Sequence, residues 1–360
     1  MCTAIQVALV DLLRSWGVIP VSVCGHSSGE IAAAYSAGAL NRESAWKIAY
    51  FRGVIAEKLV ADTACSPTTM MSVGLNEQGV LPYLTGTGVS VACINSPNNI
   101  TLSGELAAIE ELRKTFEEKE IFVKTLAVKI AYHSKIMAVG AKEYRDFIGH
   151  IETPAQPDLG IHHSIAFYSS VSGERIDLQA LRKPEYWVQN LVSPVQFNRA
   201  VVGLVSSSEG GKQSTHFLIE LGPQAALRRP VKDSLDPILE KQRWQYTSLL
   251  NRSSEDAHSI LEAAGQLWSC GAGVNLGAVN QASLHSKRAP NLLVDLPSYP
   301  FRRTREYWEE SRLSRNYAFR PYRRHSLLGL REKDWNSNEP NWKHEIRIAE
   351  NPWIVDHAVS

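Results

Sequence analysis

The stretch Gly25-His26-Ser27-Ser28-Gly29-Glu30 places a serine hydroxyl between two glycines in the pattern G-x-S-x-G. Residues 21–24 before it are typical of a buried strand, and the alanine-rich residues 31–35 after it are typical of a tightly packed helix. A sharp strand-to-helix turn strains its apex residue and exposes the apex side chain beside the positive end of the helix. This context favours a nucleophile elbow with Ser27 at its apex over an ordinary Gly/Ser turn.

A serine nucleophile needs a base to accept its proton. The candidate bases are His26, His133, His150, His162, His163, His216 and His258. His26 is adjacent to Ser27 in the chain, so its side chain leaves the turn in another direction. His133 is expected at the start of a helix after a strand, on the carboxyl edge of the sheet where Ser27 also lies. Spacing alone leaves both His133 and Arg52 open between a functional and a structural role.

The composition is that of an ordinary soluble globular protein, with 360 residues, 44% hydrophobic and 21% charged. The length allows about two domains, and a formal net charge of +1 provides no drive toward nucleic acid or membrane. No segment reaches the ~18 consecutive apolar residues of a membrane span. Five cysteines without a C-x-x-C pair predict no metal site and no disulfide framework, and indicate a reducing, cytoplasmic location.

The elements around the serine alternate between helix and strand. Apolar residues at helical spacing predict an amphipathic packing helix before residue 17, with Ile5, Leu9, Leu12, Leu13 and Trp16 on its apolar face. A later helix over 42–59 has Arg52 on the flank of its apolar side, and strands are predicted at 165–171 and 216–221. This order is typical of an α/β fold in which helices cover a parallel sheet.

Residues 70–128 form a different pattern inside this α/β region. The predicted elements are a strand at 70–73, a helix at 76–83, strands at 89–94 and 100–103, a helix at 105–119 and a strand at 122–128. The order β-α-β-β-α-β over fewer than sixty residues predicts an inserted ferredoxin-like subdomain. A helix is then expected from Lys129 toward Phe147, and a last helix over 256–270.

The chain changes character near Leu296, where a proline- and arginine-rich stretch begins and continues to Pro321. Acidic residues interleave with the arginines, so an extended linker is favoured over a nucleic-acid-binding arm. Residues 342–348 alternate as in a strand, and residues 353–360 enter a further element in which the sequence stops. The pattern predicts the opening of another domain.

Taken together, the motifs resemble the acyltransferase domain of modular megasynthases, in particular fungal-type highly reducing polyketide synthases, which are similar to animal fatty acid synthase. The resemblance lies in Gly25–Glu30, in Arg52 25 positions after the serine, and in Ala131-Tyr132-His133-Ser134. It extends over Asn95-Ser96-Pro97, Tyr186-Trp187-Val188-Gln189-Asn190-Leu191-Val192-Ser193-Pro194-Val195 and Glu220-Leu221-Gly222-Pro223. It implies an acyltransferase domain over 1–290, with 70–128 inserted, and a linker over 291–322.

The resemblance implies a Ser27–His133 dyad that takes a malonyl group from malonyl-CoA onto the serine. The phosphopantetheine thiol of an acyl carrier protein then accepts the group, so the chain itself would bind no resident cofactor. Arg52 would bind the free carboxylate of the malonyl unit through two parallel hydrogen bonds. The ketosynthase and dehydratase domains of the same synthase are implied as further partners.

Three further residues enter the implied substrate-binding set. Ser28 would supply one oxyanion donor through its backbone N–H, and His26 and Asn95 would line the substrate site. In the resembled family the second oxyanion donor comes from a glutamine-containing, glycine-rich loop upstream of the elbow. Because the sequence begins at the helix just before the elbow, we expect an N-terminally truncated domain with half of its oxyanion hole.

The last residues resemble the start of the dehydratase domain that follows the acyltransferase in these synthases. His357 would be its base and the first residue of an H-x-x-x-G-x-x-x-x-P motif that continues past residue 360. Residues 323–360 would then begin the N-terminal hot-dog fold, truncated as a partial hot-dog strand. The acidic partner lies on a second hot-dog fold outside the sequence, so no dehydration is expected.

Two alternatives compete with the acyltransferase. An α/β serine hydrolase shares the elbow, but it predicts an acidic third member, a later histidine near the C-terminus and no role for Arg52. The non-enzymatic alternative is a catalytically inactive fragment, and it is considered because the domain is expected to be truncated. The ferredoxin-like insertion and Arg52 favour the acyltransferase.

Overall fold

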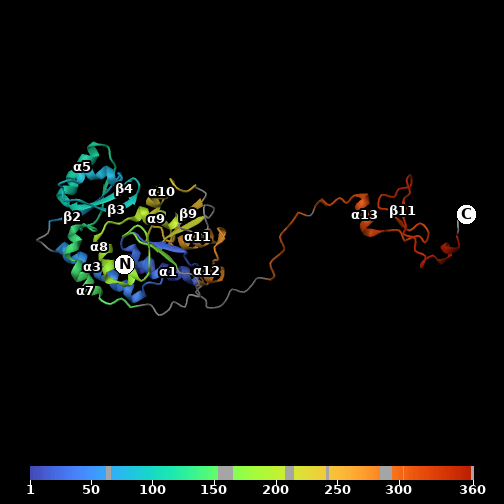
Figure 1. Cartoon of the computed structure of the whole chain (residues 1–360), viewed down its shortest axis with the longest axis horizontal. Coiled ribbons are helices and arrows are strands. Elements are labelled where there is room, and N and C mark those ends of the chain that lie inside the picture. The colour runs from blue at the N-terminus through green and yellow to red at the C-terminus, as the bar shows by residue number, and fades with distance from the viewer. Residues whose placement is uncertain are drawn as a thin grey trace. The chain divides into compact units, whose positions relative to one another are not determined.

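The computed structural model describes residues 1–61, 66–152, 165–206, 215–240, 243–283, 294–302 and 304–357. The chain divides into two compact units, Met1–Ala289 and Pro290–Ser360 (Figure 1). Each unit is described by itself. The candidate bases His162 and His163 lie outside the described residues.

The larger unit contains the predicted parallel strand pairs. Strand β1 (Ser22–Cys24) pairs in parallel with β6 (Ala166–Tyr168), with Val23 opposite Phe167. Strand β7 (Arg175–Ile176) adds an antiparallel edge to β6. Strands β8 (His216–Glu220) and β9 (Trp244–Ser248) form a second parallel pair. The α/β class is confirmed, but the described strands form two small sheets instead of one, and the antiparallel β7 was not predicted.

Helices pack against these strands and against one another. They are α1 (Cys2–Ser15), α2 (Gly29–Ser36), α3 (Arg42–Ala61), α6 (Lys135–Val139), α7 (Ala141–Ile148), α8 (Pro184–Val192), α9 (Phe197–Ser206), α10 (Arg228–Leu235), α11 (Asp256–Ser269) and α12 (Leu276–Ser283), with a 3₁₀ turn η1 at Ala180–Arg182. The helix predicted over 256–270 is therefore followed by another one. Among the described residues, no helix has both the length and the hydropathy of a bilayer-spanning segment.

The single helix predicted from Lys129 toward Phe147 is wrong in its start and in its continuity. The Ser134 hydroxyl accepts a hydrogen bond from the backbone N–H of Ile136, so Ser134 caps α6 and the helix begins one residue later. Gly140 separates α6 from α7, and a side chain at this position would overlap Ile55 of α3. The residues before Ser134 therefore lie in a turn and not in a helix.

Helix α1 buries two faces instead of the single predicted stripe. Val7 and Val10 pack into the main core around α2, α3 and α8. Leu9, Leu13 and Trp16 pack into a second core with α11 and α12, whereas Ile5, which was predicted to pack, is 36% exposed. Because α1 lies between two helical layers, both of its apolar faces are needed.

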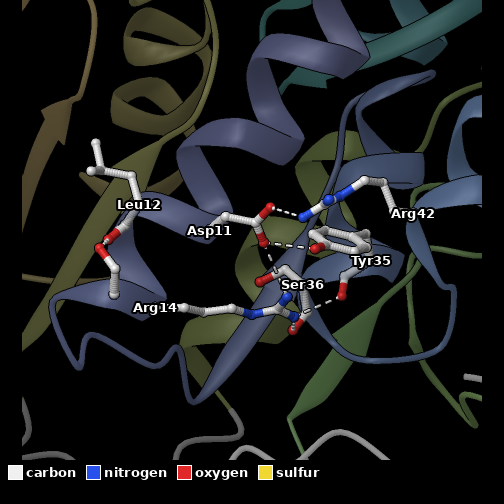
Figure 2. A network of polar contacts seen from close by, with 7 residues as sticks. Asp11, Leu12, Arg14, Tyr35, Ser36 and Arg42 are labelled. Atoms are coloured by element: carbon white, nitrogen blue, oxygen red, sulfur yellow. Dashed lines mark hydrogen bonds and ion pairs between the residues drawn. The ribbon is translucent and has the colours of Figure 1, made fainter. Parts of the chain in front are cut away.

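A polar cluster between α1 and α2 fixes α2, the helix that begins just after Ser27 (Figure 2). Asp11 accepts hydrogen bonds from the Tyr35 hydroxyl at 2.6 Å and from Arg42 at 2.8 Å. Arg14 donates to the backbone carbonyls of Tyr35 and Ser36, at 2.9 and 3.1 Å. The last carbonyls of a helix lack partners within it, so Arg14 caps the C-terminal end of α2.

The inserted subdomain has the predicted ferredoxin-like topology. Its elements are β2 (Thr68–Val73), α4 (Glu77–Leu84), β3 (Ser90–Ser96), β4 (Asn99–Glu105), α5 (Leu106–Glu118) and β5 (Val123–Thr125). The four strands are antiparallel and lie in the order β3-β4-β2-β5, with α5 packed on the sheet through Ile109, Leu112 and Phe116 (Figure 1).

Among its described residues, the smaller unit contains only short elements, one of which is a helix within the linker that was predicted to be extended. They are α13 (Arg312–Phe319), β10 (Leu330–Arg331), β11 (Trp342–Lys343) and a 3₁₀ turn η4 at Pro352–Asp356. The strand predicted over 342–348 is therefore limited to Trp342–Lys343, and the expected start of a hot-dog strand after Trp353 is a 3₁₀ turn that Pro352 initiates. A two-stranded ribbon buries too little apolar surface to extend further by itself.

Candidate active site

The elbow places Ser27 between β1 and α2 with a positive φ of 54°. This is the strained apex conformation that the G-x-S-x-G pattern predicts. A side chain at Gly25 would overlap the backbone nitrogen of Glu30, so this glycine is required by the close approach of strand and helix. A side chain at Gly29 would meet only the end of Gln6, at 3.8 Å. Glycine is therefore required on steric grounds at position 25 and not at position 29.

His133 lies in direct contact with the serine. The Ser27 Oγ is 2.7 Å from His133 Nε2, and His133 Nδ1 is 2.9 Å from the backbone carbonyl of Ser193. A carbonyl oxygen can only accept, so Nδ1 carries the ring proton and Nε2 is left to accept the proton of the serine hydroxyl. The turn before Ser134 holds His133 at φ = 58°. The geometry is that of a serine paired with a neutral base.

The surroundings of His133 favour its neutral form. The side chain is buried, and this burial lowers the pKa of His133 from 6.5 to about 3, with a further contribution from the positive charge of Arg52. The hydrogen bond to the Ser193 carbonyl acts in the opposite direction but is weaker. A base with this pKa is unprotonated, and able to accept a proton, throughout the physiological pH range.

Arg52 lies on the buried side of α3, not on its flank as predicted. Its side chain is 7% exposed, and Nη2 donates to Ser27 Oγ at 3.1 Å while Nη1 donates to the Asn190 side-chain oxygen at 2.7 Å. Among the ion pairs of the described residues, none involves this guanidinium. A buried cation with neutral partners retains its full affinity for an anion.

A buried carboxyl group lies behind Arg52, and the sequence did not assign it a role. Glu30 is fully buried at the start of α2, where it accepts hydrogen bonds from the Tyr186 hydroxyl at 2.7 Å and from the Asn190 amide at 2.8 Å. The backbone N–H of Ser170 donates to its other oxygen. Burial raises the pKa of Glu30 to about 7. The sequence signal that could have indicated this role was a glutamate directly before the apolar run of α2.

His26 and Asn95 bond to each other. His26 Nε2 lies 2.8 Å from the Asn95 side-chain oxygen, and the Asn95 amide donates to Asn99 and Thr101 of β4. The His26 ring also packs edge-on against Phe197, with 5.2 Å between ring centroids. The pair therefore connects the elbow to the ferredoxin-like sheet, and His26 is not bonded to the serine.

A cavity of about 800 Å³ opens beside His26, Ser27, Asn95 and His133, and its volume is within the size range of small-molecule sites. Ser27, His133 and Tyr132 lie on one side, the strands β2 to β5 contribute a second wall, and the beginning of α10 contributes a third. Both polar groups, such as Asn99, and apolar groups, such as Phe122, line it. The serine and its base thus face a space that can hold an elongated substrate.

The remaining predicted residues lie as follows. Ser28 is the N-cap of α2, where backbone N–H groups have no acceptor within the helix, so its N–H is available next to Ser27. His357 belongs to the smaller unit and is exposed, with its ring 6.1 Å from that of Trp353. Within the described ranges, no three His, Cys, Asp or Glu side chains lie close enough together to hold a metal ion.

The fold and the site define an α/β enzyme with a serine–histidine pair, a ferredoxin-like insertion and a buried arginine beside the serine. The model of the acyl transferase domain family matches residues 1–273. The chain therefore belongs to the acyl transferase domain family.

Relatives place this domain among polyketide synthases. The chain is 42% identical to highly reducing polyketide synthase NEC1 of Pyricularia oryzae and 43% identical to highly reducing polyketide synthase 2 of Gibberella zeae. Both matches cover 100% of this chain and 14% of the relative, so the chain spans about one seventh of the length of these proteins. The elbow, Arg52 and His133 all lie within the residues that the acyl transferase domain model matches.

Solved structures agree with this assignment. The acyltransferase domain from the second module of the salinomycin polyketide synthase is 28% identical, with a TM-score of 0.66 over 80% of this chain and 63% of that chain. The acyltransferase domain from module 8 of the same synthase is 25% identical, with a TM-score of 0.67 over 77% of this chain and 61% of that chain.

Proposed function

We propose that the chain transfers a malonyl group from CoA to the phosphopantetheine thiol of an acyl carrier protein, through an ester on Ser27, within a larger polyketide synthase. The observation that carries this proposal is Arg52, a buried cation that touches the serine at 3.1 Å and has no anionic partner in the part of the chain that the structure describes. In malonyl-CoA one methylene separates the carboxylate from the thioester carbonyl. A cation in contact with the nucleophile therefore suits a short dicarboxylic acyl group.

The proposed reaction has two halves with the same residues. In the first, His133 Nε2 accepts the Ser27 proton, Oγ bonds to the thioester carbon, the carbon–sulfur bond breaks, and CoA leaves with the proton from His133. In the second, His133 accepts the proton of the carrier thiol, sulfur attacks the ester, and Ser27 leaves with that proton. The Ser28 N–H would stabilise the oxyanion in both halves.

The walls of the cavity would hold the rest of the substrate. We assign His26 and Asn95 to the wall beside the elbow, where their mutual hydrogen bond at 2.8 Å fixes the shape of the site. No resident cofactor takes part in this scheme, because CoA and the carrier phosphopantetheine are substrates.

The direct test of the arginine compares malonyl-CoA with acetyl-CoA in Arg52→Ala. Only malonyl-CoA has a free carboxylate, and removing a charged hydrogen-bond partner costs about 1.5–3 kcal/mol, or roughly ten- to 150-fold in rate. We expect that loss in Ser27 acylation by malonyl-CoA and little change with acetyl-CoA. Arg113→Ala on α5, whose partners are Glu110 and Glu117, is the matched control. An equal fall with both thioesters would make Arg52 structural.

The serine hydrolase alternative predicts a carboxylate on the second nitrogen of the base. That nitrogen of His133 instead lies 2.9 Å from the Ser193 backbone carbonyl, which supports the dyad. Presenting labelled acyl-enzyme with a phosphopantetheine thiol separates the two functions. Transfer to the thiol supports the proposal, whereas release of free malonate at the same rate with and without the thiol supports the hydrolase.

We also propose that residues 323–360 begin a dehydratase domain with His357 as its base, after an acyltransferase domain over 1–290 and a linker over 291–322. Two relatives match the chain over its full length, past residue 273 where the acyl transferase domain model ends, which supports a further segment of the same synthase after the acyltransferase domain. Limited proteolysis tests the boundaries, because the described residues of the linker before α13 form no helix or strand and are mostly exposed, and such a segment is the most accessible to a protease. We expect first cleavages within 291–322, and first cleavages inside the two flanking domains would contradict the division.

A further inference from the structure

We propose that Asn190 is a positioning and specificity residue whose neutral amide holds Arg52 against Ser27 and keeps the Glu30 carboxylate from pairing with the guanidinium. The proposal rests on the proposed function, because it concerns how the site keeps a cation available for the substrate carboxylate. It assigns a role to a side chain 138 positions away from Arg52 in the chain.

Among the hydrogen bonds of the described residues, Asn190 is the one residue that contacts Arg52, Glu30 and Ser27 together. Its side-chain oxygen accepts from Arg52 Nη1 at 2.7 Å. Its amide nitrogen donates to Glu30 Oε2 at 2.8 Å and to the backbone carbonyl of Ser27 at 3.1 Å. The side chain is 2% exposed, so water does not substitute for these partners. Helix α8 is thereby joined to the elbow and to α3 at one amide.

The direction of these hydrogen bonds is set by chemistry. Arg52 can only donate and a carboxylate can only accept, so a group between them must accept on one side and donate on the other. An amide does both without carrying a charge. A carboxylate in the same place would form an ion pair with Arg52, and in a buried site that pair would compete strongly with any substrate carboxylate.

The arrangement of Glu30 supports the same conclusion. Its other partners are the Tyr186 hydroxyl and the Ser170 N–H, and none of them touches Arg52 in the contacts of the described residues. Asn190 therefore links the buried Glu30 carboxyl group to the buried Arg52 guanidinium. Tyr186 donates to the same Glu30 oxygen as Asn190 but has no recorded contact with Arg52, so it offers a matched control.

The test compares Asn190→Asp, Asn190→Ala and Tyr186→Phe in the full chain, with Ser27 acylation measured separately for malonyl-CoA and acetyl-CoA. Asn190→Asp preserves the shape of the side chain, adds a charge that neutralises Arg52, and removes the donor to Glu30 and to the Ser27 carbonyl. Because the lost contact to Ser27 affects both thioesters, we expect the malonyl-to-acetyl ratio of acylation rates to fall about tenfold or more, as for loss of a charged contact. Tyr186→Phe should leave the malonyl-to-acetyl ratio unchanged.

Asn190→Ala removes the support of Arg52 without adding a charge, and should lower the same ratio. Circular dichroism and a thermal unfolding curve establish that each variant is folded, and if one variant does not fold the other decides. Equal losses with both thioesters, or a wild-type ratio in Asn190→Asp, would overturn the role of Asn190. A wild-type chain that is not acylated by malonyl-CoA would instead overturn the proposed function.

Discussion

The pH dependence of acyl-serine formation is a demanding prediction, because the structure gives His133 a pKa of about 3. Only the neutral imidazole can accept the Ser27 proton. At pH 5 an ordinary histidine with a pKa of about 6.5 is about 3% neutral, whereas His133 is about 99% neutral. We therefore expect the rate of Ser27 acylation to stay level from pH 8 to pH 5, where an ordinary histidine would lose about thirtyfold.

The assay is rapid-quench labelling with malonyl-CoA at several pH values, under conditions in which one turnover is observed. Glu30 is a second group in this network that titrates in this pH range, since burial raises its pKa to about 7. Glu30→Gln removes that titration and is the control. A tenfold fall per pH unit below 6.5 that persists in Glu30→Gln would refute the account of a buried neutral base.

Further predictions concern folding. The pKa of His133 is lower in the folded chain than in the unfolded chain. Its contribution to the free energy of unfolding is therefore full above pH 6.5 and is lost as the pH falls toward 3. Because His133→Gln lacks this titration, it should lose less thermal stability than the wild type between pH 7 and pH 5. Gly25→Ala forces a side chain into the backbone of Glu30 and should cost about 3 kcal/mol or more, as urea unfolding would show. Asp11→Ala removes the acceptor shared by Tyr35 and Arg42 and should lower stability by about 1 kcal/mol, and a change above 3 kcal/mol would contradict this (Figure 2). Phe116→Ala removes a fully buried side chain from the face of α5 that packs on the sheet and should cost about 3–5 kcal/mol, measured in the same way.

Local patterns were enough to predict the elbow and the ferredoxin-like subdomain. The strand, turn and helix around Ser27 are contiguous, and the alternating and helical apolar patterns of the subdomain each occupy one segment. Local chemistry also predicted the apex strain at Ser27, because a tight strand-to-helix turn requires it. These features depend on neighbours in the chain.

Arrangements that join distant segments were not predictable in the same way. Arg52 was expected on a helix flank, yet Asn190 and Ser27 draw its guanidinium into the interior from 138 and 25 positions away. The role of Glu30 depends on Tyr186 and Asn190 of α8, which the sequence separates from it by more than 150 positions. Such partners become visible only when the helices pack.

Short-range capping explains the remaining difference near the histidine. Helical spacing suggested a helix through His133, but the Ser134 hydroxyl caps α6 and releases His133 into a turn with positive φ. That turn directs the ring toward Ser27, where Nε2 lies 2.7 Å from Oγ. A continuous helix would have placed the ring elsewhere. The start of α6, which was predicted wrongly, is therefore what brings His133 to Ser27.

The central claim is that Ser27 carries the malonyl group, and peptide mass spectrometry of the chain after incubation with malonyl-CoA tests it most directly. The account predicts one malonyl ester on the peptide that contains Ser27, its absence in Ser27→Ala, and its persistence in the neighbouring variant Ser28→Ala. An ester that remains in Ser27→Ala, or that maps to another residue in the wild type, would contradict it.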